Sequence, residues 1–253
     1  MGIYMFLKTI HNANFIHRDI HSGNILFFDN YLNGYQWQIG DLGLSQPANN
    51  TSSNDGIFGV MPYIAPEVLN GGSVSKASDI YSMGMIMWEL TTGYKPFANV
   101  KQNAAELLID IIDGNRPDIT EDTPECYARL MKRCWDPNPL KRPIIKEVHK
   151  IFDGWYRGKK YQFDQAEIKR LELMKHCPEI AVMHPNAVFT SRNSSSLFSR
   201  SSPIMNSLYI NQGYVSKEYD FDIPSPPTIN TDSTMINSSR KRNIKELKAK
   251  YSS

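Results

Sequence analysis

The stretch His17-Arg-Asp-Ile-His-Ser-Gly-Asn24, followed by Ile25 and Leu26, decides how the rest of the chain is interpreted. It places an aspartate, Asp19, and an asparagine, Asn24, on one short polar loop ahead of an apolar run. Phosphoryl transfer needs an acid that accepts a hydroxyl proton and oxygen ligands that hold magnesium on the phosphates. The pattern H-R-D-x-x-x-x-N supplies both, and the alternative is a surface loop with a capping aspartate.

A second carboxylate follows shortly after this loop, in Ile39-Gly-Asp41-Leu-Gly43. An aspartate on a turn after a strand suits a magnesium ligand, although most Asp-x-Gly segments are ordinary turns. The segment gains weight because a predicted hairpin separates it from Asn24. The short apolar runs 24–28 and 36–39 flank the turn 29–34, which is typical of two antiparallel strands.

Three further segments come next in the chain: Gly59-Val-Met-Pro-Tyr-Ile-Ala-Pro-Glu67, Asp79-Ile-Tyr-Ser-Met-Gly84 and Cys134-Trp-Asp-Pro-Asn-Pro-Leu-Lys-Arg142-Pro143. Each has an ordinary interpretation, which is a proline at a helix start, a helix N-cap at Ser78 or Asp79, and a turn between helices. All five segments in this order, on compatible elements, are hard to obtain by chance.

In this order, residues 1 to about 155 resemble the C-lobe of eukaryotic protein kinases, in the tyrosine-kinase-like group. The resemblance implies a mainly α fold with a small β-hairpin at the catalytic cleft. It implies ATP and Mg²⁺ as cofactors, and ATP-dependent phosphorylation of protein Ser/Thr (or Tyr) in signalling. The implied partners are a protein substrate or a regulatory protein.

The resemblance also implies roles for residues of the catalytic loop. Asp19 would be the catalytic base, and Asn24 and Asp41 would be the magnesium ligands and part of the ATP site. Leu26 would lie beneath the adenine ring. Arg18 would pair with a phosphate on the activation segment.

Structural roles follow by the same resemblance. His17 and Leu42 would lie in the hydrophobic column that links the two lobes of a kinase. Asp79 would hold the backbone of the catalytic loop from the central helix. Glu67 and Arg142 would form a buried ion pair, which is costly to break from one side.

The activation segment would run from Asp41 to Glu67. Hydroxyl groups in a polar loop are usually just solvated, but some here are candidate phosphorylation sites. These are Ser45, Thr51, Ser52 and Ser53.

The chain departs from the family at the transferred phosphate. His21 replaces the lysine that Ser/Thr kinases usually carry beside the base, and Val60 replaces a threonine. A histidine offers less positive charge at pH 7 than a lysine. The two changes remove markers that would have favoured Ser/Thr over Tyr, and we assign His21 to the catalytic group.

The largest departure is that no G-x-G-x-x-G segment and no Val-Ala-Ile-Lys strand occur in these 253 residues. We therefore expect the N-lobe to be absent and the C-lobe alone to be inactive. Three interpretations stay open: the C-lobe fragment of a working kinase, a non-catalytic kinase-derived binding module, and a degenerate copy.

Apolar periodicity predicts the helices of the C-lobe. Ile3, Phe6, Leu7 and Ile10 share one face of a helix at the start of the chain. A second apolar helix would follow the cap at Ser78 or Asp79 and end at Gly93. Further helices are predicted over 102–113, 124–135 and 143–155. A last amphipathic helix is predicted over 162–176, with one face formed by Phe163, Ile168, Leu171 and Met174.

Composition divides the chain into three parts. Residues 1–155 hold the kinase-like portion, residues 156–185 form a flanking segment with a candidate helix, and residues 186–253 are rich in Ser, Asn and Pro. This last part cannot bury enough apolar surface to offset its ordering entropy, which predicts a disordered tail. Its basic end, 239–250, is a solvated charged tail, a nuclear-import patch or a helix that binds a partner.

Charge and hydropathy exclude some classes of partner. A net charge of +2 gives no global reason to seek nucleic acid or a membrane surface. No apolar stretch reaches the ~18 residues of a membrane span. Three cysteines without metal-ligand spacing favour a reducing compartment. We expect a cytoplasmic protein, or a nuclear one through the basic C-terminus.

Overall fold

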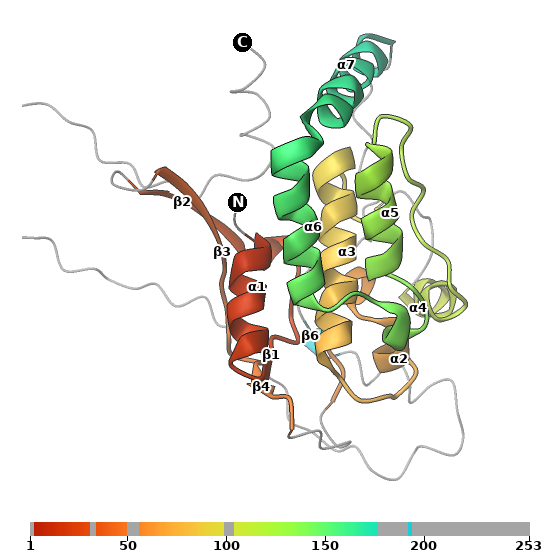
Figure 1. The fold of residues 1–253 in the computed structure, drawn as a ribbon. Helices are drawn as coiled ribbons and strands as arrows, with labels where there is room; N and C mark the ends of the chain where they lie inside the picture. Colours follow the sequence, from red (N-terminus) through yellow and green to blue (C-terminus); the bar gives the residue numbers. More distant parts are fainter. Residues whose placement is uncertain (1–2, 31–33, 50–55, 99–103, 177–191, 194–253) are drawn as a thin grey trace, which may run out of the picture.

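The computed structural model describes residues 3–30, 34–49, 56–98, 104–176 and 192–193. It is mainly helical, which confirms the predicted fold class (Figure 1). The helices are α1 (Ile3–Asn12), α2 (Pro66–Leu69), α3 (Lys76–Thr92), α4 (Ala104–Ile112), α5 (Glu125–Cys134), α6 (Ile145–Gly158) and α7 (Lys160–His176). The strands are β1 (Phe15–Ile16), β2 (Ile25–Asn30), β3 (Gly34–Ile39), β4 (Gln46–Pro47), β5 (Phe58–Gly59) and β6 (Arg192–Asn193).

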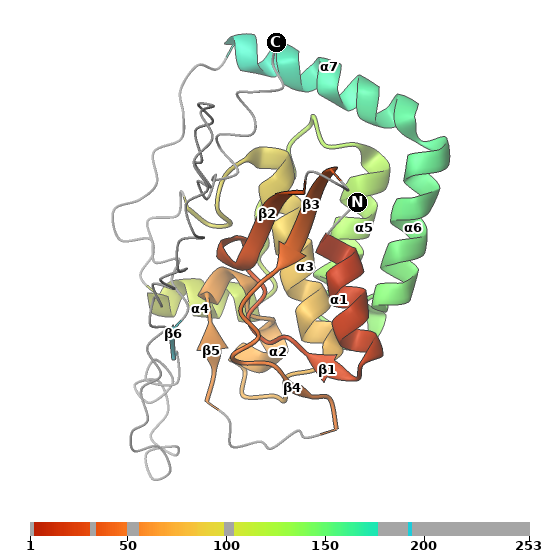
Figure 2. The ribbon, with the colours of Figure 1, turned by 90° about the vertical axis from the view of Figure 1, so that its left-hand side faces the viewer.

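Helix α3 lies at the centre of the fold, between α5 on one side and α1 and α6 on the other (Figures 1 and 2). Every residue from Ser78 to Glu89 on this helix is buried. An element that is apolar or buried all round belongs to the core of a protein, not to its surface. Helix α5 packs directly on α3, whereas α4 contacts α2 and α7 contacts α6.

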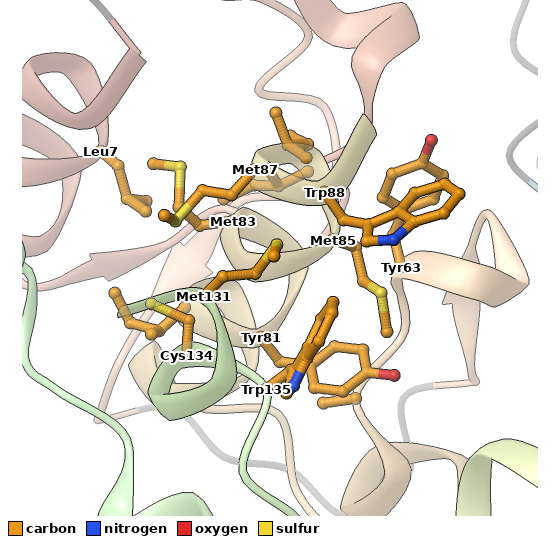
Figure 3. Packing of buried hydrophobic residues seen from close by; sticks show 14 of the residues in the cluster. Leu7, Tyr63, Tyr81, Met83, Met85, Met87, Trp88, Met131, Cys134 and Trp135 are labelled. Carbon is orange, nitrogen blue, oxygen red and sulfur yellow. The ribbon is translucent and has the colours of Figure 1, made fainter. Parts of the chain in front are cut away.

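Packing on α3 joins residues that are far apart in the sequence. Figure 3 shows Met83 and Met87 on the side of Leu7 from α1, and Tyr81 beside Trp135. Of the predicted apolar face of the first helix, Leu7 is fully buried, and Ile3 and Phe6 are half-buried against the core. The other buried positions of α1 are Tyr4 and His11, so the prediction is confirmed only in part.

A glycine brings α3 and α5 into close contact. A Cβ atom added at Gly84 would lie 2.9 Å from the Cβ atom of Cys134 and 3.4 Å from the carbonyl oxygen of Met131. Any larger side chain at this position would push the two helices apart.

The start of α3 differs from the prediction. Ser75 is the N-cap, and its hydroxyl accepts a hydrogen bond from the Ala77 N–H at 3.2 Å. The Ser75 N–H in turn donates to the Ser78 hydroxyl at 2.9 Å, completing a capping box. The predicted cap at Ser78 or Asp79 is wrong, because Ser78 is the inner partner of the box and Asp79 lies within the helix.

The predicted hairpin is present and longer than expected. β2 and β3 pair antiparallel from Ile25↔Ile39 to Asn30↔Gly34, and β3 contacts α1. The hairpin connects the segment that ends at Asn24 to the segment that contains Asp41. Two smaller pairs, β1 with β4 and β5 with β6, complete the strands among the described residues.

The helices at the C-terminal side agree with the predicted ranges to within a few residues, but α7 packs differently from the prediction. Only Phe163 joins the aromatic cluster, at 5.7 Å from the ring centroid of Trp155 and 6.4 Å from that of Tyr127. Ile168 and Leu171 are exposed, so the predicted apolar face is not buried beyond its first turn. The side chain of Met174 lies outside the described residues.

Of the predicted tail 186–253, the structure describes only the two residues of β6. Within the described ranges, no helix has the length and apolar character needed to cross a bilayer.

Candidate active site

The site begins with a buried carboxylate on α3. Oδ2 of Asp79 accepts the backbone N–H of His17 at 2.9 Å, and Oδ1 accepts that of Arg18 at 3.0 Å. Nε2 of His11 lies 2.8 Å from Oδ2 of the same carboxylate. Arg18 has a left-handed backbone, with φ of 75°, which a non-glycine residue adopts at a cost. The aspartate thus fixes an unfavourable turn of the loop to the central helix.

His17 links this loop to the segment that holds Asp41. Its side chain is fully buried, and its Nδ1 accepts the N–H of Asp19 at 3.3 Å. In the neutral ring Nε2 then carries the proton, and it donates to the carbonyl oxygen of Gly40 at 3.1 Å. Leu42, which the resemblance places in an apolar column with His17, is 57% exposed in the part of the chain that the structure describes.

Asp19 and Asn24 are joined within the loop. The side-chain amide of Asn24 donates to the carbonyl oxygen of Asp19 at 2.9 Å, and the Asp19 carboxylate is buried. The backbone oxygen of Asn24 accepts the Gly40 N–H at 2.7 Å, beside Asp41. Asp41 itself is exposed, with φ of 56°, and its Oδ1 accepts the Gly43 N–H at 3.1 Å.

These contacts bear on whether the site suits a magnesium ion. The Asn24 amide uses its nitrogen on Asp19, so its oxygen is the atom left to face a cation. Asp41 adds an exposed carboxylate from the adjacent segment. Both are oxygen donors of the kind Mg²⁺ prefers, and magnesium usually keeps waters and phosphate oxygens as its other ligands. The residues present therefore fit the ion, although no group of three acidic, histidine or cysteine ligands occurs among the described residues.

His21 lies beside the carboxylate of Asp19. Its Nδ1 accepts the N–H of Gly23 at 3.1 Å, so the neutral ring carries its proton on Nε2, which lies 3.7 Å from Oδ1 of Asp19. A Cβ atom added at Gly23 would lie 2.7 Å from the His21 ring. The glycine therefore leaves room for this orientation, which turns an N–H toward the place where Asp19 would meet a hydroxyl.

A buried polar network beneath the loop was not predicted. The Tyr63 hydroxyl donates to Oε2 of Glu89 at 2.6 Å and lies 3.4 Å from the Ser22 hydroxyl. Lys95 lies 3.1 Å from Oε1 of Glu89 and also donates to Ser22. Burial, and then the charge of Glu89, raise the pKa of Tyr63, so the phenol stays a neutral donor. The network ties the catalytic loop to the segment after β5.

Glu67 and Arg142 form the ion pair that the resemblance implies. Two parallel hydrogen bonds of 2.7 Å join the guanidinium to the carboxylate. The guanidinium also donates to the carbonyl oxygens of Ala77 and Asp136, at 3.0 and 2.8 Å. Its charge is thus fully satisfied although its side chain is inaccessible to solvent. The role of the pair is structural, because it joins α2, α3 and the turn before α6.

The remaining predicted residues lie around this centre. Leu26 is half-buried against Gly40, whose added Cβ atom would lie 2.8 Å from it. Nη1 of Arg18 donates to Gln46 at 2.9 Å. The Ser45 hydroxyl is 3.5 Å from the carbonyl oxygen of His17. Of the other candidate phosphorylation sites, Thr51, Ser52 and Ser53 lie outside the described residues.

Comparison with known families supports this arrangement. Residues 4–152 match the family described as protein tyrosine and serine/threonine kinase. The chain is 35% identical over 149 residues to a probable serine/threonine-protein kinase of Dictyostelium discoideum, covering 58% of this chain and 9% of the relative. It is 33% identical over 164 residues to the calcium and calcium/calmodulin-dependent serine/threonine-protein kinase of Pisum sativum, covering 64% and 30%.

A third relative is the dual specificity protein kinase shkC of Dictyostelium discoideum, 32% identical over 152 residues, with 58% of this chain and 29% of the relative covered. The chain thus spans less than a third of the length of each of these relatives.

Proposed function

This chain belongs to the protein tyrosine and serine/threonine kinase family, and from that premise we propose that it carries the catalytic loop of a kinase that phosphorylates proteins. The reaction would move the γ-phosphoryl group of ATP to a protein hydroxyl. One observation carries the proposal. Asp79 and His17 fix the loop so that Asp19, Asn24 and the segment of Asp41 converge at one place. Phosphoryl transfer depends mostly on such positioning.

Each residue has a defined task in this proposal. Asp19 accepts the proton of the attacking hydroxyl as the oxygen–phosphorus bond forms. Asn24 and Asp41 would hold the magnesium ion, which neutralises charge on the phosphates when bound. The N–H at Nε2 of His21 orients toward the Asp19 carboxylate and helps to hold it in place. Leu26 would contribute to the floor under the adenine base.

The substrate class is a protein hydroxyl, which we assign first to serine or threonine. The relatives with printed specificity are named as serine/threonine kinases, and one is named as a dual specificity kinase. The loss of lysine at position 21 and of threonine at position 60 weakens the distinction from tyrosine. A mixed peptide set is therefore the suitable first substrate.

We propose further that these 253 residues alone do not catalyse phosphate transfer from ATP. They contain no glycine-rich phosphate loop and no Val-Ala-Ile-Lys strand. ATP would then lie on an open face where water screens the charges that stabilise the transition state. A kinase-derived binding module would show the same inactivity, so a second experiment is needed to separate the two.

The test joins the ATP-covering lobe of an active member of this family ahead of Ile3, keeping the rest of the chain; we call this protein the active fusion. We expect it to transfer phosphate from labelled ATP to serine or threonine peptides, and the Asp19→Asn fusion to lose transfer. The unfused chain should be inactive with the same peptides. A folded fusion that lacks activity would favour the binding-module interpretation, and Asp19-dependent turnover by the unfused chain would contradict the proposed inactivity.

A further inference from the structure

A two-residue strand from the C-terminal part of the chain pairs with the segment beside the catalytic aspartate. β6 runs antiparallel to β5, with Phe58 opposite Asn193 and Gly59 opposite Arg192. More than 130 positions lie between the paired residues (192 − 59 = 133). Figure 2 shows β6 next to β5. The edge of β5 therefore already holds an extended segment.

The strand β5 lies next to the proposed base, which faces the direction in which a side chain at Gly59 would project. Gly59 has φ of 125°, and a Cβ atom added to it would lie 3.4 Å from Oδ1 of Asp19 and 3.3 Å from Ile64. Only a glycine lets the backbone of β5 pass so close to this carboxylate. In an antiparallel pair, directly opposed Cα atoms are about 4.5–5.5 Å apart. A segment paired with Gly59 therefore lies one strand spacing from the strand next to Asp19.

We propose that the chain's own segment at Arg192–Asn193 docks on the β5 edge in competition with a protein substrate. The competition with a substrate rests on the proposed function. The docking itself depends only on the strand pairing.

The physical basis is addition of a strand to an open edge. The edge of a short strand carries N–H and C=O groups that an extended segment satisfies through main-chain hydrogen bonds, as β6 does for β5. A protein substrate must bring a hydroxyl to Asp19, which lies next to the same strand. In sequence, Arg192 and Asn193 are preceded by Thr190 and Ser191 and followed by three serines, so the segment has the hydroxyl-rich composition of a kinase substrate.

Because the segment is part of the same chain, it occupies the β5 edge more readily than a free peptide would. A tethered strand binds at an effective concentration set by its linker, which a dissolved substrate must exceed. The pairing covers only two residues on each side, so we expect a docked state that substrate displaces rather than a permanent block.

The docking is tested by disulfide trapping in the full chain, without ATP. Cys126 and Cys177 are replaced by serine, and Phe58→Cys is combined with Asn193→Cys. Directly paired antiparallel residues have Cα atoms about 4.5–5.5 Å apart, which suits a disulfide. The control combines Phe58→Cys with Ser207→Cys in the same C-terminal part. We expect an intramolecular disulfide for the first pair to form much faster than for the control, as measured by peptide mass spectrometry.

Equal rates for the two pairs, or a disulfide-linked dimer as the main product, would overturn the intrachain docking. A measurement that leaves β5 unchanged guards against misfolding of the cysteine variants. Arg192→Pro with Asn193→Pro removes two backbone donors. It should speed hydrogen exchange in the peptide that contains Phe58 and Gly59, whereas Ser207→Pro with Leu208→Pro should not. Unchanged exchange in both would also overturn the docking.

The competition is tested in the active fusion. The proline pair at 192 and 193 should lower the KM for a substrate peptide several-fold with kcat nearly unchanged, and the pair at 207 and 208 should leave both constants as they were. An unchanged KM, with docking shown by trapping, would overturn the competition alone. An inactive fusion with normal trapping would reject the proposed function and leave the docking intact.

Discussion

Arg142 and Glu67 form two parallel hydrogen bonds of 2.7 Å each, although 75 positions separate them in the chain. The guanidinium is inaccessible to solvent, and the carboxylate is only 20% exposed. Two charges in this environment stabilise the fold only as a pair, because either one alone would be left buried without compensation. This relationship fixes α2 against the turn that precedes α6.

We therefore expect Glu67→Gln to lower the free energy of unfolding by about 3–5 kcal/mol, since it leaves the Arg142 charge uncompensated. The matched control is Glu125→Gln, which breaks the exposed pair with Arg129. Exposed helix pairs contribute about 0.3–0.5 kcal/mol. Urea denaturation of the two variants gives both values, and similar losses would show that the Glu67 pair is not special.

The aspartate beneath the catalytic loop gives a second prediction. Asp79→Asn replaces one acceptor oxygen by a donor, so the N–H of His17 or of Arg18 loses its partner. Hydrogen bonds to a charged group contribute about 1.5–3 kcal/mol each, and we expect a destabilisation in that range. Hydrogen exchange at Arg18 should accelerate as well. The exposed Asp113→Asn is the control, and a loop amide that exchanges at the same rate in both variants would argue against the anchoring.

Two helical glycines should respond in opposite directions to the same substitution. Gly84→Ala places a methyl group 2.9 Å from Cys134, and overpacking of this kind typically costs about 1–3 kcal/mol. Gly154 lies in α6 with nothing within 4 Å of an added Cβ atom. Gly154→Ala should stabilise the protein by about 0.5–1 kcal/mol, because alanine has the higher helix propensity. Thermal unfolding of both variants tests the pair, and a shift of the same sign in both would contradict the packing.

The cysteines should differ sharply in reactivity. Burial raises the pKa of the Cys134 thiol to about 12, whereas Cys126 is partly exposed and its pKa is raised by burial to a lesser extent. A raised pKa means a smaller thiolate fraction, and the thiolate is the reactive form. In a Cys177→Ser background at pH 8, iodoacetamide should modify Cys126 first and Cys134 only after unfolding in urea. Native-state modification of Cys134 at the rate of Cys126 would show that the α3–α5 contact opens.

The histidine beside the base offers a test of charge. In the active fusion, His21→Lys should raise kcat, by about tenfold or more, because a fixed cation stabilises the developing phosphate charge better than a neutral N–H. Lysine substitution at His149 on α6 is the control and should leave kcat unchanged. A lower kcat in the His21→Lys fusion would show that the ring itself is required.

Local patterns were sufficient to predict the longer helices and the β2–β3 hairpin, but not the four-residue helix α2. The spacing of Leu7 with its apolar neighbours, and the paired runs that became β2 and β3, are signals contained within a few turns of chain. Helix α7 shows the limit of this approach. Its apolar residues repeat with some helical spacing, but no described element covers Ile168 or Leu171, because periodicity does not specify a partner surface.

The parts of the site that could not be predicted depend on long-range contacts. Tyr63, Glu89 and Lys95 carry no shared motif, yet in the folded chain Glu89 contacts both Tyr63 and Lys95, and these two residues contact Ser22. The cap of α3 was misplaced because Ser75 and Ser78 are both good capping residues, and only the observed bonds show which is outside the helix. The strand β6 was missed because its surroundings have the composition of a disordered tail.

Helix α3 has a consequence for how sequences of this kind can change over evolutionary time. With twelve consecutive buried residues, from Ser78 to Glu89, it has no solvent-facing side on which substitutions are neutral. Most replacements there would open a cavity, create a clash or bury an unpaired polar group. Divergence within the fold is thereby channelled to α4 and α7, whose outer faces are exposed. An amino-acid change on α3 would survive mainly when a facing residue such as Met131 or Leu7 changes with it.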